Sequence, residues 1–269
     1  MTQCIASDNT PIYFTDTGAG PVLMLAHGYG CTSRYFRKNI PELSKHFRVI
    51  AVDLRGQGHS NKVTKGPRVS RLATDIHGLL TELNLTNVTY LGWSMGASVG
   101  WNYWDLFGAD RLAKFIFVDE PALAAADPDN PTGAMSMDDL TAFQNNMRDH
   151  TDARLKLLSA HSYIKKELNI DDLVADSQLG NGDFLSQLIF NHHVLDWSDV
   201  LPTITLPTLV FSGENSLVNW KSTKHVSDMI PNSRFERFSD AGHMLFFEYP
   251  EKFNQLVTEF VENKQFQLQ

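Results

Sequence analysis

The segment that decides the fold runs from Val88 to Gly100 and reads VTYLGWSMGASVG. Its first four residues form a short apolar run that predicts a buried strand, and the small residues 97–100 belong to a predicted helix. Between these elements lies Gly92-Trp93-Ser94-Met95-Gly96, in which glycines flank the serine and give the backbone room for a sharp turn. Because such a turn holds the serine hydroxyl at the N-terminal end of a helix, Ser94 is predicted to be a nucleophile.

Alternating strands and helices extend on both sides of this turn. Short apolar runs predict strands at residues 12–14, 22–26, 49–52, 115–117 and 208–212, and a further strand is expected at 233–238. Helical patterns lie between them, at residues 35–45, 71–83 and 222–229 and from 250 onward. This alternation predicts an α/β fold with a mostly parallel, doubly wound sheet.

The segment 122–204 interrupts the alternation. Its pattern predicts amphipathic helices at residues 137–148, 153–168 and 183–195, the first of them capped by Ser136. We therefore expect a core domain made of residues 1–121 and 205–269, with residues 122–204 inserted as a helical cap.

Composition narrows the classes of partner and compartment. The chain has 269 residues, a formal charge of -8 and no block of basic residues, which argues against a nucleic-acid partner. We expect a cytoplasmic protein, because the first twenty residues lack a signal-peptide pattern and no apolar stretch is long enough to span a membrane. The two cysteines, Cys4 and Cys31, fit a reducing compartment. A small-molecule substrate is expected, and a monomer and a homodimer are equally compatible with the sequence.

Metal binding is not indicated by the sequence. The carboxylates of Asp127 and Asp129 lack the ligand spacing and the glycine of a calcium loop. His192 and His193 are adjacent on a predicted helix, so their side chains point in different directions. We expect no metal site and no cofactor.

Four segments together resemble the α/β-hydrolase superfamily, and the resemblance covers nearly all of the chain outside the helical insertion. The first is the serine turn already described. His27-Gly28-Tyr29-Gly30 is similar to the oxyanion loop of that superfamily, and residues 53–60, DLRGQGHS, are similar to its structural D-x-R-G-x-G-x-S turn. Ala241-Gly242-His243, after the last predicted strand, resembles its catalytic histidine loop.

The resemblance implies a role for each of these residues. Ser94 would be the nucleophile and His243 its base, since histidine titrates in the useful range and the family order is serine, acid, histidine. The N–H groups of Tyr29 and Met95 would form the oxyanion hole, Met95 at the positive end of a helix. His27 would brace its own loop.

The acid of the triad departs from the common family pattern. Most members carry it after the strand that corresponds to residues 208–212, but here Gly213-Glu214-Asn215-Ser216 offers no aspartate at the usual place. Asp119, at the end of the preceding strand, is the preferred candidate, because a minority of members use that site and a buried carboxylate needs a partner. Glu214 is the alternative acid. Glu120 is expected to reach the pocket mouth or solvent and is assigned no chemistry.

The reaction that this resemblance implies is ester hydrolysis through an acyl-enzyme. A serine at the turn argues against the members that use an aspartate nucleophile. Apolar walls from Gly28, Trp93, Phe143 and Trp197 would favour small to medium apolar or aromatic acyl groups. Cofactor-free dioxygenases of hydroxyquinolones, lyases and non-catalytic ligand receptors of the same superfamily are the alternatives.

Overall fold

A single eight-stranded sheet forms the centre of the computed structural model, which describes residues 2–60, 63–126, 130, 133–149, 162–163, 165 and 167–262. The strand order is β1-β2-β4-β3-β5-β6-β9-β10. Antiparallel pairing is confined to β2, against β1 and β4, and the remaining neighbours are parallel. The strands span β1 Thr2–Ile5, β2 Pro11–Thr17, β3 Val22–Ala26, β4 Arg48–Val52, β5 Val88–Trp93, β6 Leu112–Val118, β9 Thr208–Gly213 and β10 Ser233–Phe238. The predicted, mostly parallel α/β sheet is confirmed.

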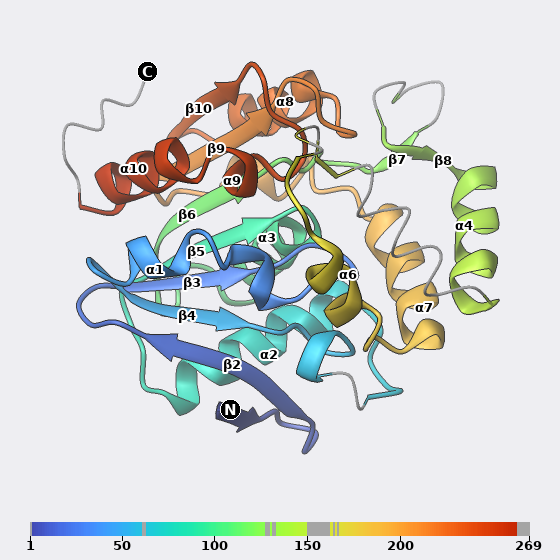
Figure 1. Cartoon of the computed structure of the whole chain (residues 1–269), viewed down its shortest axis with the longest axis horizontal. Coiled ribbons are helices and arrows are strands. Elements are labelled where there is room, and N and C mark those ends of the chain that lie inside the picture. Colours follow the sequence, from blue (N-terminus) through green and yellow to red (C-terminus); the bar gives the residue numbers. More distant parts are fainter. Residues whose placement is uncertain are drawn as a thin grey trace.

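Helices cover both faces of this sheet (Figure 1). On one face lie α2 (Val69–Glu82), α3 (Met95–Phe107) and α8 (Trp220–Met229), and on the other lie α1 (Ile40–Leu43), α9 (Leu245–Glu248) and α10 (Pro250–Val261). Strand residues alternate between the two cores: Met24 belongs to the first and its neighbours Leu23 and Leu25 to the second. The fold is therefore doubly wound.

Two stretches differ from the sequence-based expectation. Residues 35–45 were expected to form one helix, but the chain forms a short 3-10 helix, η1 (Ser33–Phe36), and then the separate helix α1. Pro41 lies in the first turn of α1, where its missing N–H is tolerated, whereas a continuous helix would need that donor. Strand β1 was not expected, because a run of four residues with a single buried side chain carries too little pattern.

Much of the described chain between β6 and β9 lies beyond the carboxyl ends of the parallel strands, at the right of Figure 1. Its elements are β7 (Ala125–Ala126), β8 (Met135–Ser136), α4 (Met137–Asp149), α6 (Asp171–Ser177), α7 (Gly182–His193) and η3 (Leu201–Thr203). The Ser136 hydroxyl accepts the Asp139 N–H at 3.2 Å and so caps α4, which packs against α7. Most of the helix expected at 153–168 lies outside the described residues.

No helix in the described part of the chain has both the length and the apolar character needed to cross a bilayer.

Candidate active site

Ser94 occupies a sharp turn between β5 and α3. Its backbone has φ +54° and ψ -130°, a conformation that L-residues rarely adopt. The turn needs glycines on either side because the backbone packs closely there. A Cβ on Gly92 would lie 2.2 Å from the Gly96 carbonyl oxygen, and a Cβ on Gly96 would lie 2.4 Å from the Ala26 carbonyl oxygen. The turn thus has the geometry of a nucleophile elbow, which holds the serine above the carboxyl edge of the sheet.

The loop after β3 lies beside this serine. A Cβ on Gly28 would be 3.0 Å from Ser94 Cβ, so a larger residue there would crowd the Ser94 side chain. Within the described residues, the N–H groups of Tyr29 and Met95 make no backbone hydrogen bond. Met95 directly follows Ser94, and Tyr29 follows Gly28 and lines the same cavity as Ser94. Two free donors at this place can stabilise an oxyanion.

His27 braces that loop from inside. Its Nε2 accepts the Leu54 N–H at 2.9 Å, so Nδ1 carries the proton and donates to the Gly28 carbonyl at 2.7 Å. Burial lowers the pKa of His27, which keeps the ring neutral and this pattern intact. The Tyr29 hydroxyl donates to the Leu185 carbonyl at 2.8 Å and ties the loop to α7.

His243 and Asp119 are brought together from residues 124 positions apart. His243 Nδ1 lies 2.7 Å from Asp119 Oδ2, and both side chains are buried. Since a carboxylate accepts, Nδ1 donates and the ring presents Nε2 as its basic nitrogen. Asp119 follows β6 in a left-handed conformation, with φ +55°, which turns the chain away from the sheet.

Asp119 receives further donors besides His243. Its Oδ1 accepts from the Ser212 hydroxyl at 2.5 Å and from the Gly213 N–H at 3.3 Å, and its Oδ2 accepts from the Ser216 hydroxyl. The donors together compensate a buried negative charge. Ser216, which stands where the common family pattern has its acid, therefore donates to the carboxylate of Asp119, and the sequence did not predict this.

Glu214 is placed elsewhere. Its carboxylate is 38% exposed and lies 3.7 Å from Arg237, at the outer side of the β9–α8 loop. The alternative acid of the sequence analysis is therefore not next to His243 in this structure. Its backbone explains the placement, because the Glu214 N–H continues the sheet by donating to Phe238.

The histidine loop has two supports that sequence reasoning missed. Glu248, at the end of α9, accepts the Gly242 N–H at 2.7 Å with one oxygen and the Lys165 N–H at 3.0 Å with the other. The Trp93 indole N–H donates to the His243 carbonyl at 3.0 Å. A buried glutamate four residues into a short helix gives no sequence signal, since its partners are distant backbone groups.

These residues share one cavity of about 130 Å³. Ser94 and His243 line it together with Gly28, Trp93 and Phe143. Trp197 does not line it and was wrongly placed there: its ring is packed in the core beside Trp101, with centroids 6.2 Å apart. The backbone N–H of Trp197 donates to the Ala122 carbonyl at 3.0 Å.

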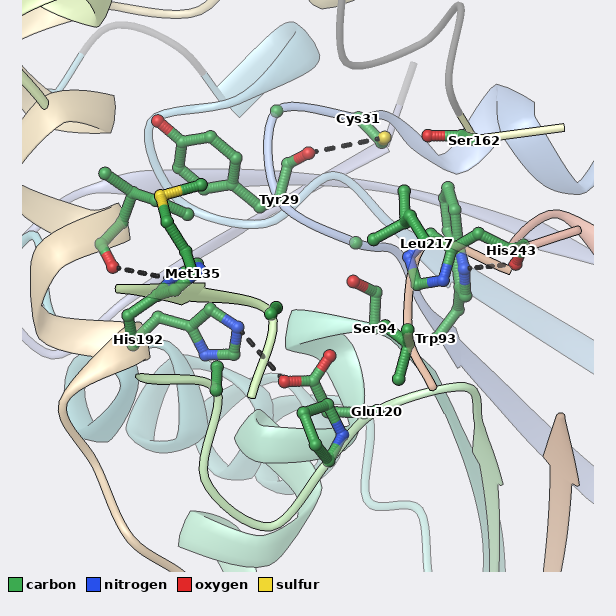
Figure 2. Close-up of a pocket in the computed structure, with 18 of the residues that line it drawn as sticks. Tyr29, Cys31, Trp93, Ser94, Glu120, Met135, Ser162, His192, Leu217 and His243 are labelled. Carbon is green, nitrogen blue, oxygen red and sulfur yellow. Dashed lines mark hydrogen bonds and ion pairs between the residues drawn. The ribbon is translucent and has the colours of Figure 1, made fainter. Parts of the chain in front are cut away.

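The cavity is also lined by two residues to which the sequence assigned no chemistry. Glu120 and His192 line its wall, with Glu120 Oε1 3.2 Å from His192 Nε2, and both are 4% exposed. Figure 2 shows Ser94 in the middle, with His243 on one side and this pair on the other. Glu120 thus reaches the pocket and not bulk solvent.

Comparisons with known proteins agree with this geometry. A family model described as the alpha/beta hydrolase fold matches residues 21–250. An esterase from Exiguobacterium antarcticum superposes with a TM-score of 0.91 at 27% identity, covering 97% of this chain and 99% of its own. A bromoperoxidase from Bacillus anthracis has the same TM-score at 25% identity, covering 97% and 100%. By sequence, a pimeloyl-acyl-carrier-protein methyl ester esterase of Vibrio campbellii is 25% identical over 94% of this chain and 99% of its own length.

The family model spans most of the sequence, including the serine elbow and the histidine loop. The chain belongs to the α/β-hydrolase fold family.

Proposed function

We propose that this protein is a serine hydrolase of carboxylic esters, with Ser94 as nucleophile, His243 as base and Asp119 as the acid that orients the base. The observation that carries the proposal is the 2.7 Å hydrogen bond between His243 and Asp119 at the cavity that Ser94 lines. The names of two relatives, an esterase and a methyl ester esterase, support the same reaction class.

The reaction proceeds in two halves. Ser94 Oγ attacks the ester carbonyl carbon while His243 Nε2 takes its proton, and the N–H groups of Tyr29 and Met95 stabilise the oxyanion. His243 then protonates the leaving alkoxide, and an acyl-enzyme remains on Ser94. Water, deprotonated by the same nitrogen, releases the acid and restores the serine. Throughout, Asp119 holds the Nδ1–H tautomer and stabilises the imidazolium.

The substrate side of the proposal rests on the walls of the cavity. Trp93, Met135, Phe143 and Ile189 give it a largely apolar lining, and its volume suits a small or medium acyl group, either aliphatic or aromatic. Residues 122–204 would act as the cap, because α4 and α7 supply one wall of the cavity and the core supplies Ser94.

Labelling and turnover together test the proposal. A fluorescent phosphonate should label the protein at Ser94, and Ser94→Ala should abolish both labelling and hydrolysis of a chain-length series of p-nitrophenyl esters. Ser98→Ala is a matched control, since Ser98 is buried in α3 outside the cavity lining. Absence of ester turnover, with oxygen uptake on a hydroxyquinolone, would replace the hydrolase by the oxygenase alternative.

A further inference from the structure

A second acid–histidine pair lies in the same cavity as Ser94. Glu120 directly follows Asp119 beyond β6, and His192 lies in the last turn of α7. Their 3.2 Å contact joins the core to the helical segment across the cavity wall, and Figure 2 shows it as a dashed line. The mechanism proposed above uses neither residue.

The hydrogen bonding of Glu120 is incomplete. His192 Nε2 lies 3.2 Å from Oε1 as an ion-pair contact, and the other carboxylate oxygen has no partner among the described residues. Figure 2 shows that oxygen directed into the space between His192 and Ser94. A nearly buried carboxylate with an unfilled acceptor is costly unless a donor reaches it, and the open side faces the place where a substrate would lie.

The neighbouring side chains offer no such donor. Pro121, Ala124 and Ile189 are apolar. His193 donates its Nδ1–H to the Ile189 carbonyl at 3.1 Å, and burial, together with the charge of His192, lowers its pKa to about 3. Its ring is therefore neutral near pH 7, and Nε2 is an acceptor. The side chains around Glu120 thus present acceptors or apolar groups, and the buried Nδ1 of His192 is a further nitrogen without a partner among the described residues.

The position of the pair indicates which part of an ester it would meet. His243 must protonate the leaving alcohol, so the alcohol lies on the His243 side of Ser94. Glu120 and His192 lie on the opposite side (Figure 2). The acyl group would extend toward them.

We infer that Glu120, held by His192, binds a hydrogen-bond donor on the acyl group of the substrate, a hydroxyl or an N–H. The inference rests on the proposed ester hydrolysis and specifies its substrate class as hydroxylated or N–H-bearing acyl esters. A hydrogen bond to a buried carboxylate lets the site discriminate between esters with and without a donor on the acyl group, because an ester without the donor leaves the carboxylate unpaired.

The test uses p-nitrophenyl phenylacetate and its ortho-, meta- and para-hydroxy forms, with each enzymatic rate divided by the alkaline hydrolysis rate of the same ester. At least one hydroxy ester should be preferred about ten- to a hundredfold in kcat/KM. Glu120→Leu should abolish the preference and Glu120→Gln should reduce it. Glu214→Gln, at an exposed carboxylate outside the cavity, should keep it.

Binding separates the two proposals. The Ser94→Ala protein is titrated calorimetrically with phenylacetamide and its hydroxy forms, which are uncharged and need no turnover. Tighter binding of a hydroxy amide without turnover of any ester would overturn the hydrolase and keep the donor site. Equal binding of all amides and equal corrected rates for all esters would overturn the donor site and keep the hydrolase.

Discussion

Two adjacent carboxylates, Asp119 and Glu120, each meet a histidine, and the two pairs differ in how completely they are satisfied. Asp119 accepts from His243 and from three further donors of β9 and the loop after it. Among the described residues Glu120 has an ion-pair contact with His192 and keeps an oxygen toward the cavity. A saturated carboxylate fixes the orientation of its histidine. An unsaturated one is suited to bind a group that arrives with the substrate.

The largest expected effect comes from breaking the saturated pair. Asp119→Asn should lower kcat for p-nitrophenyl acetate about 10⁴-fold, because the amide cannot hold His243 in the Nδ1–H tautomer or stabilise its imidazolium. Steady-state kinetics measure the loss, and circular dichroism checks the fold. Glu214→Gln serves as the control and should leave kcat within about twofold. Equal losses in both variants would refute the assignment of Asp119.

Moving the carboxylate from position 119 to position 216 tests the same pair in a second way. The Ser216 hydroxyl lies 3.4 Å from His243 Nδ1, so an aspartate at 216 can reach the same nitrogen. Asp119→Asn combined with Ser216→Asp should recover about ten- to a hundredfold of the lost kcat. Ser216→Asp alone should lower kcat, because two carboxylates would then compete for one site. If the double variant is no faster than Asp119→Asn, the geometry at 216 does not support the acid.

The two pairs also mark how far sequence reasoning reaches. The strands at 22–26 and 208–212 and the serine turn follow from local pattern, because apolar runs predict buried strands and flanking glycines predict bends. Asp119 was predicted because a buried carboxylate needs a partner, and because His243 needs an acid that the loop after residues 208–212 does not supply at the usual place.

The donors to Asp119 and the partner of Glu120 could not be predicted in this way. Ser212 in β9 and Ser216 in the following loop act through hydroxyls, and a serine alone does not indicate its partner. His192 meets Glu120 only because α7 packs over the carboxyl edge of the sheet. Trp197 was placed in the pocket on residue type alone, although the packing of the segment buries it. Contacts between distant segments depend on packing that no local pattern encodes.

A pH effect on stability is expected from the neighbour of the unsaturated pair. The folded pKa of His193, about 3, lies below its unfolded value near 6.5, so the unfolded chain binds more protons between these values. The neutral His193 ring therefore contributes fully to the free energy of unfolding above about pH 6.5, and this contribution is lost as the pH falls. The free energy of unfolding in urea should fall between pH 7 and pH 5 by about 1–2 kcal/mol less in His193→Gln than in wild type. His225→Gln, at an exposed position of α8, should lose as much as wild type.

The smallest effect tests whether the saturated pair depends on its loop as well as on its acid. Glu248→Gln keeps one acceptor oxygen for two backbone N–H groups, so its amide nitrogen must face either Gly242 or Lys165. The His243 loop would shift, and kcat should fall about tenfold with KM nearly unchanged, because the loop positions the base and not the substrate. Glu251→Gln, exposed in the first turn of α10, is the matched control. If KM rose as much as kcat fell, Glu248 would act in substrate binding. The His243 side of the cavity would then no longer differ from the Glu120 side in serving only to position the base.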